Sequence, residues 1–179
     1  MEKLSIVQFH RFMRGNFAES IRKAYRTHEI FCEADLQSFA WHKIRLFLAN
    51  NEEAPGKFRV LNKPFLREAK TYPDLVVFRR RKPWVVIELK ESRKFLQRSA
   101  AAEWEKLLGA KKILEPKRGY LVYVARIGTK RAVLGAKGKG AYYFFEVPIV
   151  LSQCMSNAEV KKWTVEFRRW SKYMLHSEG

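Results

Sequence analysis

Residues 71–90 have the sequence TYPDLVVFRRRKPWVVIELK, and this stretch decides the fold. It holds two apolar runs, 75–78 and 84–89, separated by four basic residues and a proline. Valine, isoleucine, phenylalanine and tryptophan favour strands, and a short polar link between two such runs predicts an antiparallel hairpin. We therefore expect a hairpin at the centre of the chain, with a strongly basic tip formed by Arg79, Arg80, Arg81 and Lys82.

The register of this hairpin brings three functional groups together. With Arg81 as the tip, Asp74 lies seven residues before it and Glu88 seven residues after it, so the two carboxylates face each other. Directly opposed side chains share one face of a sheet, with Cβ atoms about 4.5–5.5 Å apart. Because side chains alternate along a strand, Lys90 lies on the same face as Glu88. The sequence thus predicts two carboxylates and an amine at the open end of the hairpin.

Two facing carboxylates repel each other, and one is driven toward protonation unless a cation lies between them. Mg²⁺ prefers such oxygen ligands, commonly one or two carboxylates with water and substrate phosphate. A lysine beside the ion can orient an attacking water or help to deprotonate it. The alternative is a surface hairpin in which Asp74, Glu88 and Lys90 form solvated ion pairs. Against it, Glu88 and Lys90 interrupt the end of a hydrophobic strand, where neither residue type is favoured.

Pro73-Asp74, thirteen further residues and then Glu88-Leu89-Lys90 resemble the signature of the PD-(D/E)xK nuclease superfamily. The resemblance covers about 29–126, in the family's order of helix, strands, helix and strand. It implies a restriction-endonuclease-like fold and a metal-dependent phosphodiesterase. It also implies that Asp74, Glu88 and the carbonyl of Leu89 bind Mg²⁺, for which Mn²⁺ would substitute, and that Lys90 positions or activates water.

In that family an acidic residue on a preceding helix joins the site. The expected helix over 29–48 offers Glu33 for this role. Helical spacing places Glu33 at the edge of a core-facing stripe that holds Gln37, Ala40 and Ile44. Glu33 therefore either reaches the site or extends into solvent, and Glu29, one turn earlier, is the alternative.

The chain of 179 residues has 36 Lys and Arg against 18 Asp and Glu, a net charge of +18. This excess predicts a polyanionic partner, nucleic acid before a membrane surface. No apolar stretch is long enough for a membrane span, and no secretory signal is visible, so we expect a cytoplasmic protein with no membrane partner. Cys32 and Cys154 are too few for a disulfide framework or a zinc site, and we expect both to be buried free thiols.

Two segments concentrate the positive charge. One is the hairpin tip with Arg80, Arg81 and Lys82, and the other is the glycine-rich, acid-free segment 116–145. A glycine-rich basic segment can lie along a phosphate backbone, whereas the alternatives are a solvated turn and a disordered loop. Walker spacing is absent, so no nucleotide cofactor is expected. The expected nucleic-acid contacts in the second segment are Lys130, Arg131, Lys137 and Lys139.

The remaining patterns complete an α/β fold, a central mixed sheet of four or five strands flanked by helices. The helix after Lys90 and the apolar run 120–125 suggest a crossover into a parallel strand. The helix after Lys90 is expected over 95–114. A further helical region is expected over 1–26, broken at Gly15-Asn16, and further strands over 57–68 and 141–150.

We expect a nuclease core over 29–150, preceded by a helical extension, 1–28, and followed by a C-terminal helix, 151–179. That last helix has an apolar stripe that suits core packing or a dimer seam, which leaves a homodimer open. The stripe consists of Val160, Trp163, Phe167, Trp170 and Met174.

Together these features predict a Mg²⁺-dependent DNA endonuclease. The rival hypothesis is a DNA- or RNA-binding module that keeps the fold without catalysis, and an RNA substrate stays open. Gln97 is a further polar candidate, but Ala101 stands where RecB-like exonucleases have a tyrosine, which argues against that subtype. Resolvase, restriction, homing, repair and defence enzymes all share this core.

Overall fold

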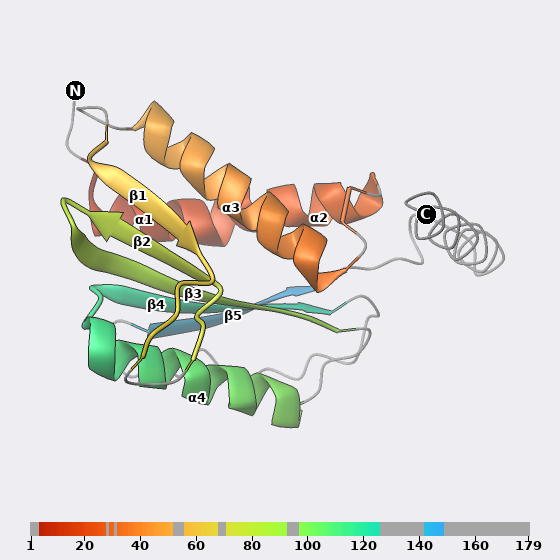
Figure 1. The fold of residues 1–179 in the computed structure, drawn as a ribbon. Helices are drawn as coiled ribbons and strands as arrows, with labels where there is room; N and C mark the ends of the chain where they lie inside the picture. Colours follow the sequence, from red (N-terminus) through yellow and green to blue (C-terminus); the bar gives the residue numbers. More distant parts are fainter. Residues whose placement is uncertain are drawn as a thin grey trace, which may run out of the picture. The chain divides into compact units, whose positions relative to one another are not determined.

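The computed structural model describes residues 4–27, 29–30, 32–51, 56–67, 71–92, 97–125 and 142–148. All of them lie in one compact unit, Met1–Ile149. Within these residues the fold is α/β, with a mixed five-stranded sheet in the order β1-β2-β3-β4-β5 (Figure 1). This confirms the predicted mixed sheet of four or five strands with flanking helices. The strands are β1 (Phe58–Asn62), β2 (Leu75–Arg79), β3 (Lys82–Ser92), β4 (Arg118–Ala125) and β5 (Tyr142–Pro148).

The sheet changes direction at its central strand. β1, β2 and β3 pair antiparallel, whereas β3, β4 and β5 pair parallel. Helix α4 (Gln97–Leu114) connects β3 to β4, which confirms the predicted crossover. β4 is buried between neighbours on both sides, as its continuous apolar sequence predicts.

The N-terminal helices form one continuous rod rather than the two pieces that Gly15-Asn16 suggested. α1 (Ile6–Phe12) begins with a capping box, in which the backbone N–H of Gln8 donates to the Ser5 hydroxyl at 3.2 Å. A π-helical turn, Met13–Phe17, then leads directly into α2 (Ala18–Arg26). The predicted break is therefore wrong, because Gly15 and Asn16 lie in this π-helical turn, and the helix continues through it.

The hairpin of β2 and β3 differs from the prediction only near its turn. Leu75 pairs with Ile87 and Val77 with Val85, as expected for a tip at Arg81, but Phe78 pairs with Pro83. The turn is therefore only Arg80-Arg81, and both residues have positive φ, as a type I′ turn requires. Trp84 is the extra residue on β3, and a bulge of this kind re-aims side chains.

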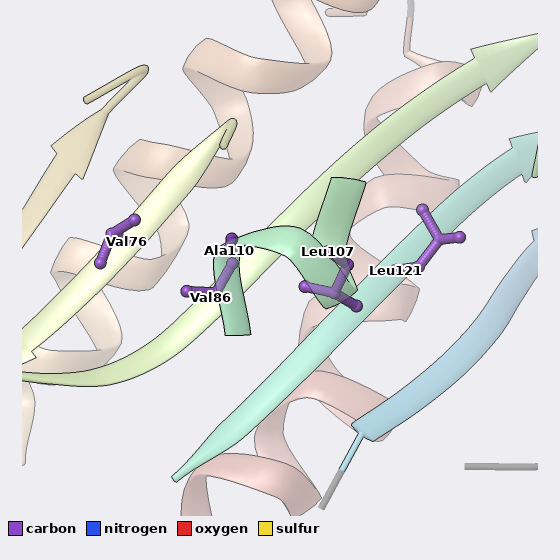
Figure 2. Close-up of a cluster of buried hydrophobic side chains, with 5 residues drawn as sticks. All are labelled: Val76, Val86, Leu107, Ala110 and Leu121. Carbon is purple, nitrogen blue, oxygen red and sulfur yellow. The ribbon is translucent and has the colours of Figure 1, made fainter. Parts of the chain in front are cut away.

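That bulge lets Trp84 join an aromatic core on the face covered by α1, α2 and α3 (Glu33–Asn50). The Phe9 ring lies 5.2 Å from Trp84 and 6.1 Å from Tyr120, centroid to centroid. The helical extension thus packs on the sheet. The opposite face is covered by α4, and Figure 2 shows its buried cluster, formed by Val76, Val86, Leu107, Ala110 and Leu121.

Helix α3 begins at Glu33, four residues later than predicted. Cys32 is its N-cap, and its backbone N–H donates to the Asp35 carboxylate at 3.2 Å. Cys32 is exposed, so the prediction of a buried thiol is wrong for it, whereas Cys154 lies outside the described residues.

In the part of the chain that is described, no helix is both long and apolar enough to cross a membrane. The predicted C-terminal helix, 151–179, lies outside that part.

Candidate active site

The site lies at the carboxyl end of β3, between the first turns of α3 and the middle of α4. Asp74 immediately precedes β2, and Glu88 follows the Leu75–Ile87 pair on β3. The next position outward from that pair therefore brings residues 74 and 88 opposite each other, as the hairpin register predicted. Beyond this pair β3 continues to Ser92 beside β4, whereas β2 begins only at Leu75, so the side of β3 next to Asp74 has no paired strand there.

Asp74 is held rigidly from two directions. Its side chain is only 6% exposed, and its carboxylate accepts hydrogen bonds from the Gln37 amide and from the Leu89 backbone N–H, the latter at 2.8 Å. Burial raises the pKa of the Asp74 carboxyl, and the Leu89 N–H partly opposes this by stabilising the anion. Gln37 lies one turn after Glu33, so both residues project from the same side of α3.

Glu88 is the most unusual group in the site. It is 0% exposed, and neither of its carboxylate oxygens has a hydrogen-bond donor among the described residues. Burial, followed by the nearby Asp74 charge, raises the pKa of Glu88 to about 9, although the Lys106 ammonium opposes the shift. At neutral pH without a bound cation, Glu88 therefore keeps its proton and can donate it in a hydrogen bond to Asp74.

Lys90 bridges the two helices that flank the site. Its ammonium lies 2.8 Å from a Glu33 carboxylate oxygen and 4.0 Å from an oxygen of Glu103. The hydrogen bond to Glu33 raises the pKa of Lys90, which outweighs the effect of partial burial. Lys90 is therefore a charged hydrogen-bond donor in this arrangement and not a free amine.

Two residues of α4, Glu103 and Lys106, complete the cluster, and neither was predicted from the sequence. Lys106 lies 2.7 Å from Glu103 and 3.7 Å from the buried Glu88. Burial lowers the pKa of Lys106, but the Glu103 hydrogen bond and the nearby carboxylates raise it overall. The sequence does hold a pattern that indicates Glu103, because this residue occupies the same helical stripe as the core residues Leu107 and Ala110.

The backbone of Leu89 also faces the site. Its N–H donates to Asp74, and in a β-strand the N–H and C=O of one residue point to the same side. The Leu89 carbonyl therefore points toward the edge where β2 has ended and Asp74 lies. This is the orientation needed for the ligand role that the family resemblance implies.

Other predicted residues lie elsewhere. The exposed Glu29 accepts a hydrogen bond from the Thr27 hydroxyl at 2.7 Å, and Glu33, not Glu29, contacts Lys90. The basic turn is at the opposite end of β3, since the six residue steps from Lys82 to Glu88 span about 20 Å. The side chain of Gln97 and the predicted contacts at Lys130, Arg131, Lys137 and Lys139 lie outside the described residues.

The residues at the turn have different surroundings. The Arg79 guanidinium lies over the rings of Phe58 and Trp84, at 5.5 and 5.6 Å from their centroids, so its role is in packing. Arg80, Arg81 and Lys82 are exposed, and their charges are available to a polyanion.

The donor set has a clear chemical preference. Among the described residues, no group of three or more histidine, cysteine, aspartate or glutamate side chains is arranged to hold a metal ion. What the site offers is two buried carboxyls and one backbone carbonyl, all oxygen donors. This set fits Mg²⁺ or Mn²⁺, which accept few protein ligands and keep several waters, and it does not fit tetrahedral Zn²⁺.

Comparison of the chain with protein-family models, with curated proteins and with solved structures returned no match. The geometry around Asp74, Glu88 and Lys90 therefore carries the functional assignment.

Proposed function

We propose that this chain is a Mg²⁺-dependent nuclease of the PD-(D/E)xK type, which hydrolyses phosphodiester bonds in DNA. The proposal includes a restriction-endonuclease-like core, a site formed by Glu33, Asp74, Glu88 and Lys90, and replacement of Mg²⁺ by Mn²⁺. The observation that carries it is the pair of buried carboxyls, of which Glu88 has no donor among the described residues. Such a pair is costly unless a cation binds between them.

The charge balance of the cluster supports a divalent ion. Four carboxyls meet two ammonium groups in this part of the fold, so the fully ionised cluster has a net charge of −2. One Mg²⁺ would neutralise it, and the proton on Glu88 would leave as the ion binds. The four carboxyls are those of Glu33, Asp74, Glu88 and Glu103, and the ammonium groups belong to Lys90 and Lys106.

Each residue would have a distinct role. Asp74, Glu88 and the Leu89 carbonyl would hold the ion, and Gln37 would keep Asp74 in place. When bound, the ion polarises the scissile phosphate and lowers the pKa of the attacking water. Lys90, kept protonated by Glu33, would orient that water or the phosphate as a hydrogen-bond donor.

A plasmid-nicking assay tests this proposal. Purified protein is incubated with supercoiled DNA in Mg²⁺, in Mn²⁺ and in EDTA, and the variants Asp74→Asn, Glu88→Gln and Lys90→Met are compared with Glu105→Gln. Glu105 is an exposed glutamate of α4 and serves as the matched control. We expect metal-dependent nicking by the wild type and the control, and a loss of at least about 100-fold in the site variants. Nicking by Asp74→Asn at the wild-type rate would overturn the assignment.

The rival function is a DNA- or RNA-binding module that keeps this fold without catalysis. One observation favours it: both lysines of the site are already paired with carboxylates, at 2.8 Å for Lys90–Glu33 and 2.7 Å for Lys106–Glu103. A purely structural cluster would take up no metal. Isothermal titration calorimetry with Mn²⁺ separates the two, since only the nuclease predicts uptake that Glu88→Gln abolishes.

The partners follow from charge and symmetry. The net charge of +18 supports a nucleic acid, and DNA is proposed over RNA. A homodimer, which would place two sites on two strands, is tested by sedimentation with and without DNA. An intracellular location, where Mg²⁺ and DNA are both present, completes the proposal.

A further inference from the structure

Two aromatic rings are exposed together beside the proposed active site. Among the large hydrophobic side chains that the described residues expose, Phe65 and Tyr72 are the aromatic ones, with 51% and 53% of their surface accessible. Their ring centroids are 4.7 Å apart and their planes are inclined by 34°. Aromatic surface of this size favours burial, and a contiguous exposed patch commonly marks a binding surface.

The chain fixes this pair next to Asp74. Both rings lie on the connection between β1 and β2, which runs from the sheet toward α4 in Figure 1. At its base the Lys63 N–H donates to the Asp74 carbonyl at 2.9 Å, and the Leu66 N–H donates to Thr71 at 2.9 Å. The Leu66 side chain packs against the α4-facing core cluster. The rings are therefore held on an anchored segment.

The separation from the site is short on the scale of a nucleic acid. Tyr72 and Asp74 are two positions apart in the sequence, so their Cα atoms are separated by at most about 7 Å. This corresponds to about two nucleotide steps at the 3.4 Å rise of each strand in a duplex. Exposed cations, Lys63 and Arg67, lie on the same connection and can contact phosphates.

We propose that Phe65 and Tyr72 form a stacking surface for an unpaired nucleobase, within about two nucleotides of the scissile phosphate. This inference rests on the proposed nuclease function and specifies its substrate class. Bases in a continuous duplex are stacked on both faces, so a protein ring can stack on a base only where the strand is single or splayed open. The preferred substrates are accordingly single strands, flaps or junctions with unpaired bases beside the cut.

A binding experiment in EDTA tests the stacking separately from cleavage. Fluorescence anisotropy measures the affinity of wild type and of the double variant Phe65→Leu/Tyr72→Leu for a single-stranded DNA 20-mer. The same is done with a strand of equal length in which every base is replaced by an abasic site. Leucine keeps the apolar bulk and removes the ring. The matched control is Leu46→Ala, another exposed apolar residue, on α3.

We expect the double variant to bind the normal strand roughly 5- to 150-fold more weakly than wild type, the range for losing one stacked base. Its affinity for the abasic strand should match that of wild type, and Tyr72→Phe should bind the normal strand like wild type. Equal losses on the two strands, or no loss on the normal strand, would overturn the stacking role. Weaker self-association with unchanged DNA affinity would do so too, by assigning the rings to a contact between copies.

The outcomes for the two proposals are separable. Asp74→Asn should lose cleavage in Mg²⁺ and keep base-dependent binding in EDTA, because it leaves both rings in place. If Asp74→Asn cleaves normally while the ring variant still loses base-dependent binding, the nuclease site is wrong and the stacking surface stands. If the ring variant binds both strands like wild type while Asp74→Asn loses cleavage, the stacking surface is wrong and the nuclease site stands.

Discussion

Replacing Glu88 by glutamine should stabilise the metal-free protein at neutral pH. The folded protein holds the Glu88 proton up to a pKa of about 9, whereas the ordinary pKa of this side chain is 4.5. Raising the pH from 4.5 toward 9 therefore favours the unfolded chain, which releases this proton first. Each pH unit inside that window lowers the free energy of unfolding by about 1.4 kcal/mol.

At pH 7 the wild type has lost about 3 kcal/mol of stability through this one group, relative to pH 4.5. Glutamine is close in shape, does not titrate and can still donate to Asp74. Glu88→Gln should therefore unfold like wild type at pH 4.5 and be about 3 kcal/mol more stable at pH 7 in EDTA. For a chain of this length, this corresponds to a melting temperature raised by about 6–12 °C.

Urea unfolding of wild type and Glu88→Gln at both pH values, followed by circular dichroism, measures this difference. Glu105→Gln, at an exposed glutamate of α4, should change the free energy of unfolding by less than about 0.5 kcal/mol at both pH values. Mg²⁺ should stabilise only the wild type, so at pH 7 it should reduce the difference in free energy of unfolding between Glu88→Gln and wild type. If that difference in EDTA is absent, or is equal at the two pH values, Glu88 does not retain its proton in the folded protein.

Three further outcomes are expected. Lys106→Met removes the ammonium 3.7 Å from Glu88, so the pKa of Glu88 should rise further, which ¹³C NMR of labelled glutamate carboxyls would detect as a higher midpoint. Arg81→Gly should raise the free energy of unfolding in urea by about 1 kcal/mol, because φ is +65° there and glycine tolerates positive φ; no gain would argue against a strained turn. Leu107→Ala empties part of the α4-facing core and should cost about 2–5 kcal/mol in the same assay, whereas a cost below 1 kcal/mol would contradict its full burial.

The hairpin could be predicted because strand side chains alternate with a strict period of two. Once the two apolar runs were paired, the parity of the sequence placed residues 74, 88 and 90 on one face, and the structure keeps this placement. The face of α3 that carries Gln37 followed equally from helical spacing, and its members are buried. Patterns with a fixed period therefore positioned the core of the site.

The parts that were missed depend on contacts between distant segments. Trp84, the extra residue at the bulge, packs against Phe9, which lies 75 residues earlier in the sequence, and hairpin periodicity does not encode this contact. Glu103 and Lys106 join the site only because α4 packs against β3, and the spacing within the helix does not specify that contact. The exposed position of Cys32 follows from its place at a helix N-cap, whereas the prediction relied on the usual burial of free thiols.

The bulge at Trp84 also makes the pairing register at the turn of the hairpin independent of the register at its open end. A one-residue change in loop length normally moves every following side chain to the opposite face of a sheet. Here the pairing already skips one residue, Trp84, between the Phe78–Pro83 and Val77–Val85 pairs, which lie between the turn and the two carboxyls. We therefore expect that a residue inserted or deleted at the Arg80-Arg81 turn changes the pairing only outside this step and leaves Leu75 opposite Ile87.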